Sequence, residues 1–107
     1  MKRISSLLFI FATLAFLLSC SKRDYWIRFK NDYKEAINNI TVANARLGRA
    51  DTGQVTDYKS FSGKSFIISG QSDSGLPLSK TEAVSGKGTH KWTITLNPDG
   101  TIDLTED

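Results

Sequence analysis

The sequence predicts an all-β fold, a small antiparallel β-sandwich of six or seven short strands. Apolar and polar residues alternate in several short runs, which is the two-residue period of half-buried strands. The runs recur roughly every 8–12 residues and are separated by clusters of Gly, Asn, Asp and Ser, as in other small all-β domains. No window of about 11 residues beyond the first twenty shows the period of an amphipathic helix.

The first predicted strand covers residues 25–30, in which Ile27 and Phe29 alternate with basic residues. Trp26 falls on the basic side of this strand, where we expect it to pack beneath long neighbouring side chains. Residues 31–33 carry a turn signal. The next apolar alternation, over residues 40–45, predicts the second strand.

The middle of the chain alternates between turn signals and weaker strand signals. We expect a turn at residues 48–53 and a third strand at residues 55–61. Residues 64–69 contain Phe-Ile-Ile, the most apolar short run of the domain, and therefore predict a central strand. The Gly- and Ser-rich residues 69–78 predict a long loop, and residues 80–84 a weak edge strand.

The clearest hairpin signal lies at the end of the chain. Two alternating runs flank Asn-Pro-Asp-Gly at residues 97–100, where Pro suits the second position of a type I turn and Gly supplies positive φ. The apolar members of the two runs are Trp92, Ile94, Leu96, Ile102 and Leu104. This succession of short strands resembles that of small sandwiches of the Ig-like or transthyretin-like style.

The first twenty residues have the pattern of an export signal. A basic Met-Lys-Arg head precedes a largely apolar run over residues 4–18, and the segment ends in Leu17-Leu18-Ser19-Cys20. This ending resembles the bacterial lipoprotein signal, in which Leu stands three residues before Cys and a small residue directly before it. The apolar run of about 15 residues is shorter than the roughly 20 that a membrane-spanning helix needs. The alternatives are a membrane helix and a plain signal peptide, although no Ala-x-Ala-like cleavage site is present.

The lipoprotein resemblance implies a division of the chain into three parts. Residues 1–19 would be the signal peptide, residues 20–24 a lipidated cysteine with its tether, and residues 25–107 a single β-domain. Acyl chains on Cys20 would anchor the protein in the membrane, and two or more chains hold stably. Ser21 after the cysteine points to the outer membrane, and the basic residues that follow favour a periplasm-facing protein. The whole chain resembles small lipoproteins of Bacteroidetes-type bacteria.

Composition restricts the function classes. Without Lys2 and Arg3 the chain keeps 12 of its 14 basic residues against 11 acidic ones, with both signs scattered. This balance gives no basic stripe for nucleic acid. The single cysteine leaves the domain without a disulfide of its own.

Three motifs and a single histidine superficially resemble parts of catalytic or ligand-binding sites, and each has a plainer interpretation. Asp51-Thr52-Gly53 matches the core of the aspartic protease motif, but it lacks the apolar residues that precede it and is better explained as a turn. Residues 95–106 partly match a calcium loop, but they carry strand period and Pro98. Residues 86–89 lack the spacing of a phosphate loop. His90 is the only histidine, so a zinc site is not supported. We therefore predict no catalytic residue, cofactor or metal.

The remaining interpretation is a non-catalytic binding or adaptor module for an envelope protein or a glycan. Aromatic and apolar side chains outside the predicted core are the candidate partner contacts. These are Trp26, Tyr33, Tyr58, Leu76 and Leu78. The alternative is a small enzyme or enzyme inhibitor with a dispersed site, for example one that folding forms from Asp51 and Asp57.

Overall fold

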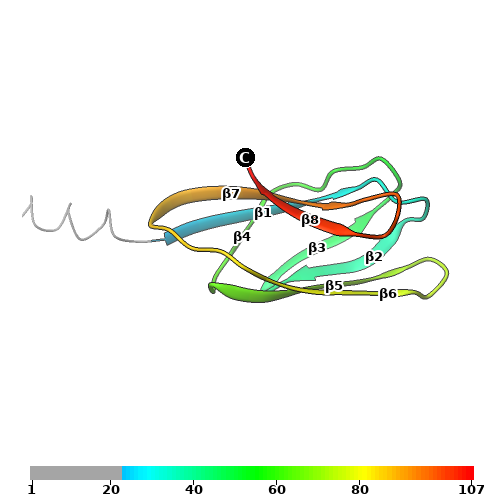
Figure 1. The fold of residues 1–107 in the computed structure, drawn as a ribbon, viewed down its shortest axis with the longest axis horizontal. Coiled ribbons are helices and arrows are strands. Elements are labelled where there is room, and N and C mark those ends of the chain that lie inside the picture. Colours follow the sequence, from blue (N-terminus) through cyan, green and yellow to red (C-terminus); the bar gives the residue numbers. More distant parts are fainter. Residues whose placement is uncertain (1–22) are drawn as a thin grey trace, which may run out of the picture.

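The computed structural model describes residues 23–107, which form an all-β sandwich (Figure 1). Eight strands follow one another along the chain: β1 (Arg23–Asn31), β2 (Ile37–Val42), β3 (Ala45–Ala50), β4 (Lys59–Phe61), β5 (Ser65–Ser72), β6 (Pro77–Ala83), β7 (Gly88–Leu96) and β8 (Ile102–Glu106). The predicted fold class is confirmed, and the strand count exceeds the predicted six or seven.

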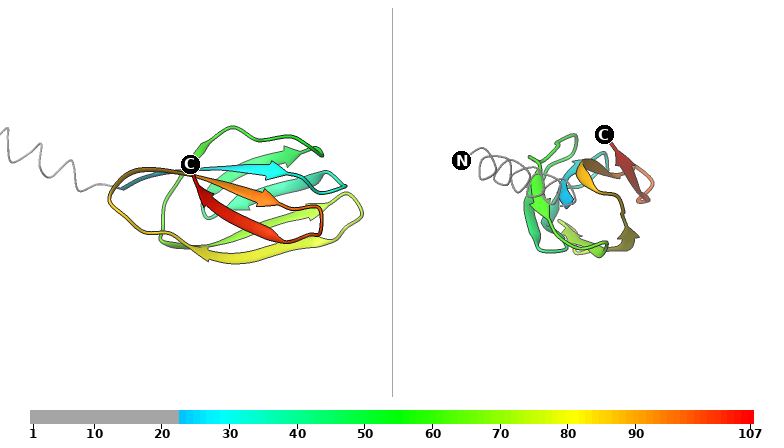
Figure 2. Two further views of the ribbon diagram at one scale, coloured as in Figure 1. Left: turned by 45° about the horizontal axis from the view of Figure 1, so that its top comes forward. Right: turned by 90° about the vertical axis from the view of Figure 1, so that its left-hand side faces the viewer.

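Two four-stranded sheets form the layers, in the orders β4-β1-β7-β8 and β3-β2-β5-β6. A view from one end of the molecule shows the two sheets facing each other (Figure 2). All pairs are antiparallel except β1 and β7, which run parallel from Arg23 opposite Gly88 to Asn31 opposite Leu96. The prediction of a wholly antiparallel fold was wrong for this pair, because alternation shows which side a residue faces and not which strand lies beside it.

The core fills the space between the sheets with the apolar residues of each alternating run. The largest fully buried side chains are Phe29, Ile27, Ile37, Ile40, Ile68, Ile94, Leu96, Val42 and Asn31. At one end the core is aromatic. The ring centres of Tyr25 and Trp92 are 4.9 Å apart and those of Phe61 and Phe66 are 5.2 Å apart, both pairs in edge-to-face contact. Burial of these side chains is the main force that holds the sheets together.

Two sequence predictions are confirmed in detail. The hairpin formed by β7 and β8 pairs Leu96 with Ile102 across the predicted turn. The Phe-Ile-Ile run lies in β5, which is an interior strand between β2 and β6. Within it Phe66 and Ile68 are buried, whereas Ile67 is 56% exposed on the outward side.

Several predicted boundaries were wrong. The single strand expected at residues 40–45 crosses the turn at Ala43 and Asn44, where β2 ends and β3 begins. The first half of the turn expected at residues 48–53 belongs to β3, and the loop expected at residues 69–78 is mostly the ends of β5 and β6. The strand expected at residues 55–61 is reduced to β4, preceded by a single bridge from Val55 to Lys30. The predicted tether ends earlier, because β1 begins at Arg23.

A buried asparagine fastens the end of β1. The Asn31 side-chain nitrogen Nδ2 donates to the Glu35 and Ala50 carbonyl oxygens at 2.8 and 3.0 Å, and the side-chain oxygen Oδ1 accepts from the Tyr33 N–H at 3.0 Å. The Asn31 N–H also donates to the Gln54 carbonyl at 2.9 Å. One side chain therefore joins β1, the loop after it and the end of β3.

Cys20 and the predicted signal segment lie outside the described residues. Within residues 23–107 the structure contains no helix that could span a membrane.

Candidate binding face

The outward side of the β4-β1-β7-β8 sheet carries a cluster of aromatic and charged side chains. Two of the sequence candidates, Trp26 and Tyr58, belong to it. We call it the Tyr58 face and define it by Trp26, Arg28, Tyr58, Lys91, Thr93 and Asp107. β1 and β7 place their members there because the alternate residues of both strands are buried in the core. The parallel register sets Trp26 beside Lys91 and Arg28 beside Thr93.

Tyr58 lies between two cations. The guanidinium carbon of Arg28 is 4.7 Å from the centre of the Tyr58 ring, and the Lys91 ammonium nitrogen is 5.1 Å from it. Both distances are within the range of cation–π attraction, which is modest at exposed sites. The ring is therefore fixed on the sheet by groups from β1 and β7.

Asp107 completes the cluster. The Tyr58 hydroxyl donates to its carboxylate, and the Thr93 hydroxyl donates to the same carboxylate at 2.7–2.8 Å. Arg28 Nε donates to the Thr93 oxygen at 2.9 Å and lies 3.8 Å from the carboxylate. Each polar side chain of the face is thus held by another one, which orders it before any ligand arrives.

These contacts shift two pKa values in opposite directions. The hydrogen bond to Asp107, together with partial burial, raises the pKa of the Tyr58 hydroxyl. Partial burial acts to raise the pKa of Asp107, but the hydrogen bonds from Tyr58 and Thr93 and the charge of Arg28 outweigh it and lower that pKa. At neutral pH Tyr58 is therefore a hydrogen-bond donor and Asp107 an anion.

The sequence candidates differ in their exposure and in where they lie on the sandwich. Trp26 is half-buried and lies between Ser60 and Lys91 of the neighbouring strands. Tyr33 and Leu78 are half-buried and pack against the core. Leu76 is 57% exposed in the turn between β5 and β6. The structure therefore brings only Trp26 and Tyr58 together on one face.

A polar network that the sequence reasoning missed joins β2, β3 and the β5–β6 turn. Arg49 contacts the Asp73 carboxylate at 3.0 Å and the Asp51 carboxylate at 3.1 Å, and Asn38 donates to Asp73 at 2.8 Å. The hydrogen bonds from Arg49 and Asn38 lower the pKa of Asp73. No sequence signal identified this network, because its members come from three separate segments.

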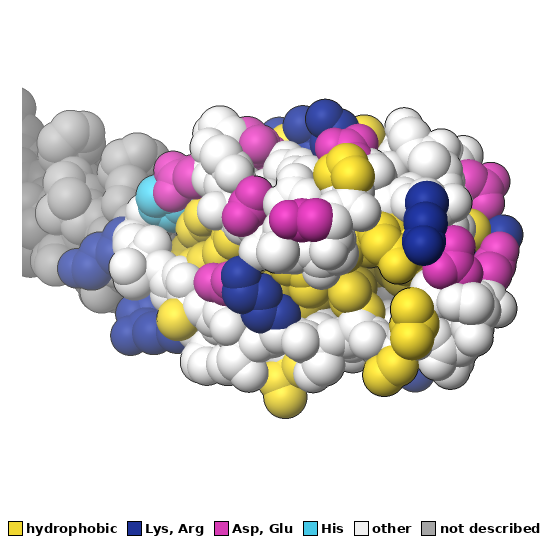
Figure 3. All heavy atoms as spheres, turned by 45° about the vertical axis from the view of Figure 1, so that its right-hand side comes forward, with side chains coloured by type: hydrophobic (Ala, Val, Ile, Leu, Met, Phe, Trp, Pro, Cys, Tyr) yellow, Lys and Arg dark blue, Asp and Glu magenta, His cyan; other side chains and the backbone are white. Residues whose placement is uncertain are grey.

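The side of the sandwich between β6 and β8 is partly open. A shallow hollow of about 440 Å³ lies there between Ser79 and Lys80 on one side and Gly100 to Asp103 on the other. Lys80 crosses it and donates to the Ile102 carbonyl oxygen at 2.6 Å. Figure 3 shows hydrophobic side chains within a recess on one face of the molecule.

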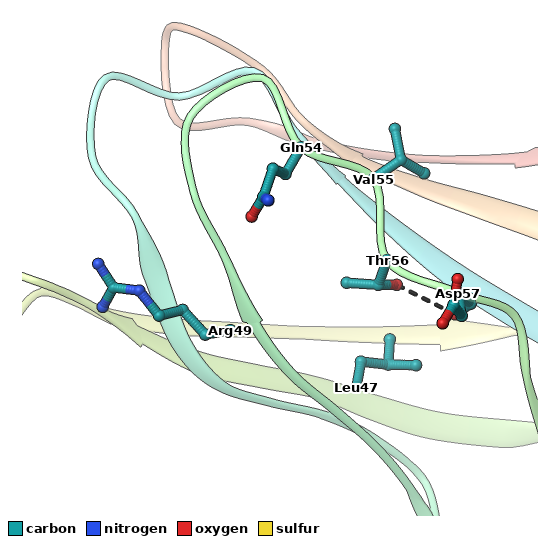
Figure 4. Close-up of a pocket in the computed structure, with 6 residues that line it drawn as sticks. All are labelled: Leu47, Arg49, Gln54, Val55, Thr56 and Asp57. Atoms are coloured by element: carbon teal, nitrogen blue, oxygen red, sulfur yellow. Dashed lines mark hydrogen bonds between the residues drawn. The ribbon is translucent and has the colours of Figure 1, made fainter.

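A second hollow, of about 250 Å³, lies between β3 and the chain that precedes β4 (Figure 4). Its walls are Leu47 and Arg49 on one side and residues 54–57 on the other. Asp57 is the one carboxylate among these lining residues, whereas Asp51 is bound to Arg49. The hollow therefore does not unite Asp51 and Asp57 in an acid–base pair.

The remaining motifs have structural roles. Asp99 accepts hydrogen bonds from the Thr101 N–H and hydroxyl at 3.0 and 2.6 Å within the hairpin turn. His90 bonds to the Lys87 carbonyl at 2.8 Å and to the Glu106 carboxylate at 3.2 Å. Among residues 23–107 no three His, Cys, Asp or Glu side chains come together as metal ligands.

Comparison with known proteins supports the fold alone. No family model and no curated protein matches the chain. A solved structure does match, described as the NMR structure of a protein from Eubacterium rectale, with a TM-score of 0.55 and 18% sequence identity. The match covers 78% of this chain and 87% of that one. A likeness at this identity shows a shared sandwich fold.

Proposed function

We propose that the protein is a lipid-anchored protein of the bacterial envelope that binds a protein partner through the Tyr58 face and catalyses no reaction. The observation that carries this proposal is the clustering of Trp26, Tyr58 and Arg28 on one exposed sheet surface. Trp, Tyr and Arg are the residues most enriched at the energetic centres of protein interfaces. Sheet surfaces of this kind offer a broad, flat contact area.

The order of the face favours binding. Arg28 and Tyr58 are held by Asp107 and Thr93 in the free protein, so a partner would not have to immobilise them. Less conformational entropy is then lost on association, which leaves more of the contact energy as affinity. Arg28 and Lys91 place two cations on the face beside the Asp107 side-chain carboxylate, so a complementary partner surface carries acidic groups opposite these two cations.

Site-specific photocrosslinking in cells that make the protein tests the proposal. A benzophenone amino acid at position 26 should give a discrete adduct, and the same probe at Ile67 on the outward side of the other sheet should not. Arg28→Ala should weaken the position-26 adduct. A protease-resistant, glycosidase-sensitive adduct would identify a glycan instead. Equal labelling at both positions, or none at position 26, would refute binding by this face.

The anchor has its own test. The intact mass of protein extracted from its native membrane should equal residues 20–107 plus acyl chains, and Cys20→Ala should abolish processing and membrane retention. A mass equal to the uncleaved chain would instead make the first segment a membrane helix. This result would leave the assignment of the Tyr58 face untouched.

A further inference from the structure

β6 is an edge strand whose outer backbone groups have no strand beside them in the sheet. It pairs with β5 alone, in unbroken antiparallel register from Ser65 opposite Ala83 to Gln71 opposite Pro77. The Ser72 N–H donates to the Leu76 carbonyl at 2.9 Å, and the Val84 N–H donates to the Lys64 carbonyl at 2.7 Å. These bonds show that Ser72 with Leu76, and Lys64 with Val84, are hydrogen-bonded pairs of the ladder.

Hydrogen-bonded pairs alternate along an antiparallel ladder. The even-numbered residues of β6 therefore direct their N–H and C=O groups toward β5. The odd-numbered residues Ser79, Thr81 and Ala83 direct theirs away from the sheet, and all three are exposed. This leaves three N–H and three C=O groups in a row on the free edge.

The other edge strands are less suitable for pairing. β4 has three residues. β3 carries two exposed arginines, and its pairing with β2 is irregular beside Gly48, where φ is +84°. On β8 the Ile102 carbonyl is already bound by Lys80. β6 combines length, regular register and a row of available groups.

The sequence of β6 is chemically symmetric about Thr81. Lys80 and Glu82 stand directly before and after Thr81 and carry opposite charges. Ser79 and Ala83 stand two residues from Thr81 on either side and are similar in size. One step further out, Leu78 matches Val84. When a second copy of this strand lies antiparallel to the first, with the two Thr81 residues opposite each other, each Lys80 lies opposite a Glu82. The strand is therefore complementary to a second copy of itself.

We propose that two copies of the protein pair antiparallel through β6, with Thr81 of each chain opposite the partner's Thr81. Ser79 would pair with the partner's Ala83, and Lys80 would lie opposite the partner's Glu82. The three outward residues of each copy would then form six backbone hydrogen bonds across a twofold axis. The two four-stranded sheets would become one eight-stranded sheet.

The surroundings of β6 have room for this arrangement. Lys80 and Glu82 already form an ion pair at 3.0 Å, with 42% and 22% of their side chains exposed. The hollow beside them is about 440 Å³ and is bounded by Ile102 and Asp103 on the opposite sheet. The partner's Lys80 and Glu82 would extend the pair into an alternating cluster of four charges. The central threonines add a favourable cross-strand contact.

A charge on an edge strand usually prevents unwanted sheet extension. Here Lys80 and Glu82 would perform that role against other strands while accepting a second copy in one register, because only that register sets opposite charges face to face. The same two residues thus provide a sharp test that does not involve the Tyr58 face.

The test measures the mass of the full chain, purified in detergent, by light scattering with the detergent contribution subtracted. Wild type should be dimeric. Lys80→Glu and Glu82→Lys should each set like charges opposite one another and raise the dimer dissociation constant about tenfold or more, since two cross-strand pairs change sign. The double exchange should restore the dimer.

Mixing the two single variants separates pairing between chains from effects within one chain. In a mixed dimer the two acids of one chain lie opposite the two bases of the other, so heterodimers should form from two weakly associating proteins. Thr81→Pro, which removes an N–H from the free edge only, should also weaken the dimer, whereas Thr81→Val should not. A wild type that stays monomeric at about 1 mM, where a dimer would be held by no more than about 4 kcal/mol, would overturn the proposal. Single variants as dimeric as wild type, or a mixture without heterodimers, would do the same.

Discussion

Replacing Asn31 with alanine should cost this small domain a large part of its stability. The side chain is fully buried and makes three hydrogen bonds, to the Glu35 and Ala50 carbonyls and from the Tyr33 N–H. A typical net contribution is about 1 kcal/mol each, so Asn31→Ala should lower the free energy of unfolding by about 3 kcal/mol. For a domain of this size that corresponds to a fall in Tm of about 15 °C.

The assay is urea unfolding followed by circular dichroism and by the fluorescence of Trp26 and Trp92. Asn44→Ala is the matched control, because the Asn44 side chain is exposed and accepts one hydrogen bond, from the Ser62 N–H. It should change stability by about 0.5 kcal/mol or less. Asn31→Asp keeps the acceptor and removes both donors, so it should be destabilised like Asn31→Ala. If Asn31→Ala costs no more than the control, then the buried network does not hold the strand end.

The remaining predictions concern pH and the polar clusters. The Lys87 carbonyl and Glu106 raise the pKa of His90 above 6.5, so its protonated form stabilises the fold below pH 6.5, and this contribution should disappear as pH rises through the raised pKa. His90→Asn should flatten the pH dependence of unfolding in that window; an unchanged profile would contradict the assignment. Gly86→Ala should cost about 1 kcal/mol or more, because φ there is +119° and the new Cβ would lie 2.9 Å from His90 Nε2; Tm measurement would detect it, and wild-type stability would argue against the close contact. Tyr58→Phe should raise the pKa of the Asp107 carboxyl, as followed by NMR titration, and an unchanged pKa would show that the hydroxyl does not bind it.

The sequence predicted elements well where burial follows a strict two-residue period with large side chains. Ile27 and Phe29 in β1 are examples, and the hairpin of β7 and β8 is another. β3 was missed because its buried positions are Ala45, Leu47 and Ala50, with Gly and Arg between them. Small residues give a weak hydrophobic signal even where they are completely buried.

Glycine and serine misled the prediction at the end of β5. Gly70 suggested a loop, yet a Cβ there would lie 3.0 Å from Ile37 Cγ2, so glycine is present because the neighbouring strand is close. Ser72 is buried, and its hydroxyl accepts a hydrogen bond from the Leu76 N–H. Polarity alone does not distinguish such a residue from a loop residue.

The binding face could be predicted only in part. Alternation placed Trp26 on the outward side of β1, but the position of Tyr58 between Arg28 and Lys91 depends on strands that lie far apart in the sequence. The sequence predicted an edge strand at residues 80–84, which overlaps the second half of β6. Which of its backbone groups are unpaired follows only from the register with β5.

The parallel pairing of β1 and β7 sets the order in which this chain can complete its fold. β1 is synthesised before the other described strands, yet it is an interior strand whose longest ladder waits for residues 88–96. Arg28 and Thr93, for example, are 65 residues apart along the chain. Contacts at such separation slow folding, because a long loop must close before they form. A nascent chain would therefore carry β1 unpaired on that side until β7 emerges, so the β4-β1-β7-β8 sheet is completed only by the last strands to be synthesised.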